Sequence, residues 1–139
     1  MATEIKILER GNEGVLSNVA PGVFDNDINS HLTAQFLADS RHHLSVAIDN
    51  GLVVGFASAL HYVHPDKPPE LWINEVGVAP THRNRGLAKL LLSVLFDVGR
   101  KCGCKEAWVL TDRPNTAAMK LYESLGGKDT DHVMFSFNL

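Results

Sequence analysis

The sequence has 139 residues, 45% of them hydrophobic and 21% charged, which is typical of a globular protein and predicts a single domain over residues 1–139. Thirteen basic against 16 acidic residues give a net charge of −3, which argues against a nucleic-acid partner. No apolar run approaches the roughly 20 residues that span a membrane, and the charged N-terminal stretch is unlike a secretory signal, so we expect a cytoplasmic protein without membrane contact.

The first half of the chain predicts one strand, two helices and a β-hairpin. Alternating apolar residues predict a strand over 4–9, and helices are expected over 13–20 and 28–40. Two β-patterned runs, 44–48 and 52–57, then flank the sequence Asp49-Asn50-Gly51. Asn-Gly between two such runs favours a type I′ hairpin turn.

The second half of the chain alternates predicted strands and helices. Strands are expected over 71–78, 107–110 and 133–138, with an amphipathic helix over 87–102 and a further helix over 115–126. Hairpin-joined strands followed by strands joined through helices predict a mixed α/β sheet.

A short basic loop connects the strand that ends at Val78 to the amphipathic helix that begins at Leu87. The unpaired backbone N–H groups at a helix N-terminus attract anions, and phosphates above all. Gly86 lets the backbone approach a ligand without a Cβ atom, and Arg83 and Arg85 can add charge-assisted hydrogen bonds. The loop therefore predicts an anion-binding site.

The pattern Arg83-x-x-Gly86-x-Ala88 resembles the pyrophosphate-binding loop of the GNAT N-acetyltransferase superfamily, whose members bind acetyl-CoA there. Asn115 at a helix start, with Tyr122 seven residues later, resembles the family's second signature. The resemblance implies the GNAT fold, an α/β fold with a mixed central sheet of about six to seven strands and helices on both faces. In this fold the fourth and fifth strands splay apart.

The resemblance also implies where acetyl-CoA, the co-substrate, would bind. Its pantetheine arm would enter the splay and pair with the fourth strand, and its pyrophosphate would lie on the basic loop. The implied cofactor-binding residues are Val76, Gly77, Val78, Arg83, Asn84, Arg85, Gly86, Leu87, Ala88, Lys89 and Asn115. Asn115 is also the expected N-cap of the last helix.

Two residues are the catalytic candidates. Glu75 could take the proton of an attacking amine or anchor the substrate, because period-two alternation puts it on one strand face with Leu71, Ile73 and Gly77. The alternative is a strand-edge carboxylate that bonds a histidine or solvent. For Tyr122, the resemblance implies a position beside the CoA sulfur, from which it protonates the leaving thiolate. The alternative is a packing residue with its hydroxyl at the rim of the core.

The expected function is transfer of an acetyl group from acetyl-CoA to a primary amine of a small molecule, by direct attack in a ternary complex. A protein or peptide N-acetyltransferase and a non-catalytic acyl-CoA-binding module remain the alternatives. Acidic residues suit a cationic amine, and the candidates for lining its site are Asp25, Asp27, Glu70, Glu75 and Asp112. The layout of the sequence, with Glu75 before Val76-Gly77-Val78, is similar to small aminoglycoside 3-N-acetyltransferases.

The apolar terminal stretch 133–138 favours a homodimer.

The two cysteines, Cys102 and Cys104, flank Gly103 and invite a comparison with metal sites. No second pair of ligands has metal-binding spacing, so we expect no metal. Cys102 is predicted to end a helix before a C-cap glycine, and Cys104 to enter the next strand. The histidine pairs His42-His43 and His61-x-x-His64 are expected in loops or at strand edges.

Overall fold

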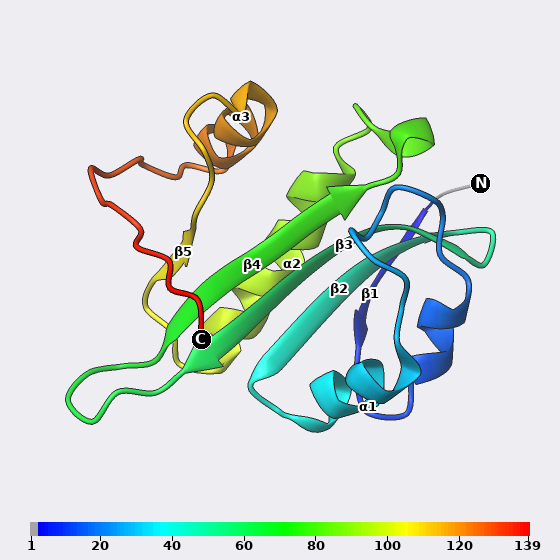
Figure 1. Cartoon of the computed structure of the whole chain (residues 1–139), viewed down its shortest axis with the longest axis horizontal. Coiled ribbons are helices and arrows are strands. Elements are labelled where there is room, and N and C mark those ends of the chain that lie inside the picture. The colour runs from blue at the N-terminus through cyan, green and yellow to red at the C-terminus, as the bar shows by residue number, and fades with distance from the viewer. Residues whose placement is uncertain (1–2) are drawn as a thin grey trace.

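A computed structural model describes residues 3–139, which fold around one five-stranded mixed sheet (Figure 1). The strands lie in chain order: β1 (Glu4–Leu8), β2 (His42–Asp49), β3 (Leu52–Tyr62), β4 (Glu70–Val78) and β5 (Ala107–Val109). Neighbours from β1 to β4 are antiparallel, and β4 and β5 are parallel. The predicted mixed α/β sheet is confirmed, but the expected six to seven strands are five. Residues 1 and 2, which begin the predicted charged N-terminal stretch, lie outside the described residues.

The terminal strand predicted over 133–138 is wrong, because these residues form no strand. Val133, Phe135 and Phe137 are 75–80% exposed, so their apolar side chains are not buried within the described chain. The physical reason is the lack of an edge to pair with. A strand of six residues needs a comparable neighbour, and β5 is only three residues long.

The helical segments are η1 (Glu13–Ser17), α1 (Ser30–Ala38), η2 (Pro80–His82), α2 (Leu87–Lys101) and α3 (Thr116–Ser124). The helix predicted over 13–20 is only a short 3₁₀ turn, whereas the other three predicted helices are confirmed with shorter bounds. Among residues 3–139, no helix combines the length and the apolar character needed to cross a bilayer.

Helices cover both faces of the sheet, as the family resemblance implies (Figure 1). On one face, α2 lies along β2, β3 and β4. Its Leu91 carbonyl accepts a 3.0 Å hydrogen bond from the buried Ser45 hydroxyl of β2. On the other face, Phe36 of α1 stacks on His42 of β2 with ring centroids 4.8 Å apart. The first contact holds the early turns of α2 on the sheet, and the second holds α1 on the opposite face.

The β2–β3 hairpin has the predicted turn. Asn50 and Gly51 have φ of 53° and 81°, and a type I′ turn requires positive φ at both central residues. The turn carries Asp49 at the end of β2, next to the basic loop that follows β4.

Candidate functional site

The outer edge of β4 is paired with β5 over only part of its length. Pairing runs from Leu71–Ala107 to Ile73–Val109 and stops there, while β4 continues to Val78. The two strands separate beyond this point (Figure 1), in agreement with the predicted splay. Within the described chain, residues 74–78 therefore present an edge without a β5 partner, which an extended ligand can join through main-chain hydrogen bonds.

A β-bulge lies in β4 at the point where this free edge begins. Ile73 pairs with Ala59 of β3 and Glu75 pairs with Ser58, so that Asn74 is an extra residue without a partner. Because Ser58 and Ala59 are adjacent in a strand, they point to opposite faces of the sheet. Glu75 and Ile73 therefore also point to opposite faces.

The predicted face of Glu75 is thus wrong in part. Glu75 shares its face with Gly77, but not with Leu71 and Ile73, because the bulge interrupts the period-two alternation. Leu71 and Ile73 are buried on the side of α2, whereas Glu75 is exposed on the other side of the sheet. The carboxylate consequently faces away from the α2 side of the core.

The loop between η1 and α1 crosses the face that carries Glu75. Phe24 stacks on Phe56 of β3 with ring centroids 3.9 Å apart, and Phe56 is the pairing partner of Gly77. A Cβ atom added at Gly77 would overlap the carbonyl oxygen of Val23. Gly77 is therefore required for this close approach of the loop to β4.

This loop also forms the wall of a cavity of about 990 Å³ between η1 and α1. Three acidic residues line it, Glu13, Asp25 and Asp27, together with the same Phe24 that stacks on Phe56. The structure thus brings together Asp25 and Asp27, two of the predicted acidic residues, next to the Glu75 face of the sheet. Glu13 was not predicted as a lining residue, because it reaches the cavity only when the following loop folds back beside η1.

The other two predicted acidic residues are not part of this cavity. Glu70 begins β4, at the end opposite Val78, and its carboxylate is 2.7 Å from Nε2 of His64. Asp112 is exposed in the loop before α3, where its carbonyl accepts the backbone N–H of Asn115 at 2.9 Å.

The basic loop enters α2 through two residues of left-handed conformation. Asn84 has φ of 63°, and Gly86, the N-cap of α2, has φ of 75°, a value that favours glycine. No side chain caps this helix start, and a Cβ atom added at Gly86 would meet nothing within 4 Å. The start of α2 is therefore without a side-chain cap, and the space at the Cβ position of Gly86 is open.

The arginines of the loop differ in their contacts. The guanidinium of Arg83 donates from Nε to the Val78 carbonyl at 3.2 Å and so closes the loop on the end of β4, whereas Arg85 is exposed. The side chain of Leu87 is buried in the core, which leaves only its backbone for a ligand.

A further contact of the loop is one that sequence reasoning missed. Nε2 of His82 lies 2.6 Å from the Asp49 carboxylate at the hairpin turn, and Nδ1 of His82 lies 2.7 Å from the Thr81 hydroxyl. The hydrogen bond with His82 lowers the pKa of the Asp49 carboxyl. Asp49 and His82 are 33 positions apart, and no local pattern links them.

The substitution Asp49→Asn is expected to loosen the basic loop. Because the contact favours the carboxylate, its contribution is present above the ordinary carboxyl pKa and is lost as the pH falls through the lowered pKa. At neutral pH we expect the amides of residues 81–85 to exchange about threefold faster in the variant, as measured by NMR. Asp39→Asn, which removes an ion pair with Arg41 instead, is the control. Equal protection of the loop in parent and Asp49→Asn would contradict the anchoring role.

The last helix carries the remaining candidates. The Asn115 side chain accepts the Ala118 backbone N–H at 3.1 Å, so its predicted role as N-cap is confirmed. Tyr122 is half-buried against the hydrophobic core, and this burial raises the pKa of its phenol. Its hydroxyl therefore keeps its proton at neutral pH. Figure 1 places α3 at the same end of the sheet as the end of β4 and the start of α2.

The histidine and cysteine predictions are corrected in part. His64 lies in a loop and His61 next to the last residue of β3, as expected, but His43 is a buried residue of β2. Cys102 is the C-cap of α2 and Gly103 follows with φ of 88°, as predicted. Cys104 does not enter a strand, because β5 begins only at Ala107.

Comparison with protein families assigns most of the chain. Residues 16–127 match the family described as "Acetyltransferase (GNAT) family". The aminoglycoside N(6′)-acetyltransferase type 1 of Salmonella typhimurium is 33% identical over an alignment of 94 residues, and the match covers 65% of this chain. The chain spans 65% of the length of that curated relative, slightly less than two thirds. The relative carries the 6′ designation, not the 3-N designation that the sequence layout suggested.

Solved structures share the fold over the whole chain. An aminoglycoside acetyltransferase from an uncultured soil metagenomic sample has a TM-score of 0.84 at 22% identity, with 100% of this chain and 99% of that chain covered. The aminoglycoside acetyltransferase AAC(6′)-Iy, solved with the bisubstrate analogue CoA-S-monomethyl-acetylneamine, has a TM-score of 0.79 at 26% identity, with the same coverage.

Proposed function

The chain belongs to the acetyltransferase (GNAT) family, as the match over residues 16–127 shows, and from this we propose that it is an acetyl-CoA-dependent N-acetyltransferase of small primary amines. The observation that carries the proposal is the meeting of two features at one end of the sheet. They are the unpaired edge of β4 over residues 74–78 and the uncapped start of α2 at Gly86.

These two features fit the two parts of CoA. The free edge can pair with the amide-bearing pantetheine arm, as an added strand would. The N–H groups at the start of α2, with Arg85 beside them, can hold the diphosphate. The proposed binding residues are Val76, Gly77, Val78, Arg83, Asn84, Arg85, Gly86, Leu87, Ala88, Lys89 and Asn115. The Val78 carbonyl already accepts one hydrogen bond from Arg83 and keeps a second lone pair for the ligand.

The proposed reaction forms a bond between the amine nitrogen and the acetyl carbon and breaks the carbon–sulfur bond of the thioester. Glu75 takes a proton from the amine, directly or through a water, or anchors the substrate. Its exposed position on the strand face opposite α2 supports access from the side of the acidic cavity. Tyr122 returns a proton to the leaving thiolate, a role that its retained phenol proton supports. The Val76 N–H is the proposed donor to the thioester carbonyl, a kind of contact worth about 3 kcal/mol in other enzymes.

The acidic cavity is the proposed acceptor site. Glu13, Asp25 and Asp27 give it a negative wall that attracts a cationic amine, and Phe24 connects the wall to the sheet face of Glu75. Acetyltransferases named for aminoglycosides, which are polyamines, stand among the relatives and the structural neighbours. A small polycationic amine therefore fits both observations.

The proposed function is tested by the release of free thiol from acetyl-CoA in the presence of aminoglycosides, polyamines, amino acids and peptides. We expect release with the polycationic small molecules, and a lower kcat/KM after Asp25→Asn together with Asp27→Asn. Release with peptides alone would favour the protein acetyltransferase. Binding of acetyl-CoA without release for any amine would favour the non-catalytic module.

The exposed apolar C-terminal segment, residues 133–139, supports a further proposal, that two copies of the chain form a homodimer through it. Val133, Phe135 and Phe137 lie outside the core, and within residues 3–139 the short β5 offers them no partner strand. Burying them against a second copy removes apolar surface from water.

We expect light scattering at micromolar concentration to give the mass of two chains, and Phe135→Lys to give the mass of one. Leu32→Lys, which charges a 59% exposed apolar residue on α1, should remain dimeric and serves as the matched control. A single-chain mass for the parent protein would contradict the homodimer.

A further inference from the structure

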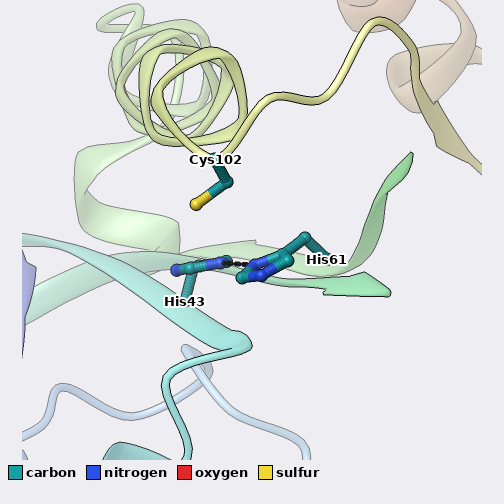
Figure 2. A group of neighbouring side chains, drawn as sticks. All are labelled: His43, His61 and Cys102. Carbon is teal, nitrogen blue, oxygen red and sulfur yellow. Dashed lines mark hydrogen bonds between the residues drawn. The ribbon is translucent and has the colours of Figure 1, made fainter. Parts of the chain in front are cut away.

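Three metal-binding side chains meet at the end of α2 that is remote from the proposed acetyl-CoA site. His43 comes from β2, His61 from β3 and Cys102 from the C-cap of α2. One ligand atom from each lies within 4.8 Å of the other two. Figure 2 shows the Cys102 sulfur directed toward the two imidazole rings. From this convergence we propose that the chain binds one Zn²⁺ ion through two imidazole nitrogens and one thiolate.

The spacing of the ligand atoms is close to what zinc requires. Nε2 of His43 and Nδ1 of His61 are 2.7 Å apart in a hydrogen bond. In a tetrahedral site with Zn–N of about 2.0–2.1 Å, the two nitrogens would be about 3.3 Å apart. To bind the ion, the nitrogens would separate by about 0.6 Å and each ring would turn its lone pair from the other ring toward the metal. The proton of the hydrogen bond would pass through solvent to the other nitrogen of its own ring. Imidazole and thiolate together are the donor set that zinc prefers.

Zinc binding also sets a requirement on the protons of its ligands. A neutral imidazole has a lone pair for a metal, and zinc binding replaces the thiol proton of Cys102, which is released to solvent. The half-buried positions of His61 and Cys102 leave a path for the ion and room for water as a fourth ligand.

The backbone holds the three residues in place before any ion binds. Gly103, with φ of 88°, turns the chain after α2, and the Cys104 N–H donates to the Gly99 carbonyl at 2.9 Å, which fixes Cys102 between them. His43 pairs with Ala59 in the sheet, and the N–H of His61 donates to the Arg41 carbonyl at 3.0 Å. Binding of the ion therefore costs less conformational entropy than it would if the three residues lay in flexible loops.

The site would join α2 to the sheet and is separate from acetyl transfer. Gly86 and Cys102 lie at opposite ends of a 15-residue helix, which is about 22 Å long. We therefore expect zinc to raise the melting temperature by ligand linkage and to leave turnover unchanged. This separation makes the inference independent of the proposed function.

The test uses the purified, metal-free full chain. Titration with Co²⁺ should produce a thiolate-to-cobalt charge-transfer band, Zn²⁺ should abolish the band by competition, and calorimetry should give one Zn²⁺ per chain. Cys102→Ser and His61→Asn should each weaken Zn²⁺ binding at least tenfold, or about 1.4 kcal/mol. Cys104→Ser and His64→Asn, which change the same residue types outside the cluster, should bind like the parent.

Circular dichroism establishes that each variant is folded. If Cys102→Ser does not fold, His61→Asn, whose side chain is more exposed than that of His43, decides the outcome. The absence of a charge-transfer band in the parent would overturn the proposal, as would Zn²⁺ affinity unchanged in the folded variants of the cluster.

Discussion

The substitution Tyr122→Phe is expected to lower turnover about 100-fold, within the range for general acid–base groups, while acetyl-CoA affinity stays nearly unchanged. The phenylalanine keeps the ring that packs against the core and removes only the hydroxyl. Without that proton donor the thiolate must leave unprotonated, which raises the barrier by about 2.7 kcal/mol. Steady-state kinetics and calorimetry with acetyl-CoA measure the two quantities separately.

Tyr62→Phe is the matched control for this experiment. The Tyr62 hydroxyl accepts a 3.1 Å hydrogen bond from the Trp108 indole, and Tyr62 pairs with Glu70 at the end of β4 opposite Val78, so its loss should leave turnover unchanged. The pH profile gives a second readout. If Tyr122 is the acid, its loss should remove the alkaline limb of the rate profile, where the raised phenol pKa would otherwise end activity. Equal turnover in Tyr122→Phe and parent would reduce the residue to packing.

The substitution Gly86→Glu is expected to weaken acetyl-CoA binding at least tenfold, or about 1.4 kcal/mol. The new carboxylate would stand at the uncapped start of α2, where it repels the diphosphate and occupies the open space at the Cβ position. Calorimetry with acetyl-CoA measures the loss, and circular dichroism shows whether the fold survives.

Backbone strain is the competing cause, since Gly86 has a left-handed φ of 75°. Gly86→Ala introduces the strain without the charge, and should therefore weaken binding less. Gly11→Glu places the same charge and strain at a glycine with φ of 97° that is likewise free of neighbours, and should not change acetyl-CoA affinity. If Gly86→Glu binds acetyl-CoA as the parent does, the diphosphate is not held at this loop.

Sequence patterns predicted the elements whose causes are local. The Asn50–Gly51 turn and the Asn115 cap each depend on residues within a few positions, and both are confirmed. The amphipathic α2 is also confirmed, although Leu90, expected on its apolar face, is 51% exposed. The bulge at Asn74 has no such local cause. The bulge depends on how β4 aligns with β3. A prediction from period-two alternation alone therefore placed Glu75 on the wrong face of the sheet.

In the terminal segment, by contrast, a strand was predicted where none forms. Residues 133–138 have the composition of a strand, but strand formation also needs an edge of matching length, which the short β5 does not provide.

Long-range contacts explain what else was missed in the candidate site. Gly86 stood out because a glycine before a helix has a local meaning, and the structure adds that it has a left-handed φ of 75°. The contact of Asp49 with His82, and the approach of Cys102 to His43 and His61, join residues that lie 18 to 59 positions apart. Spacing rules for metal ligands apply to neighbours along the chain, so they could not indicate a cluster assembled by the sheet.

Because of the bulge, β4 contains one residue more than its pairing with β3 requires. Asn74 is surplus to the pairing with β3, so a chain shortened by that residue would keep Ile73 and Glu75 on their present opposite faces. The pairing with β5 stops at Ile73, immediately before the surplus residue. A regular strand would lack the bend that a bulge imposes, and its parallel ladder with the following strand could continue further. The insertion of one residue can thus end the pairing of two parallel strands, whatever side chain that residue carries.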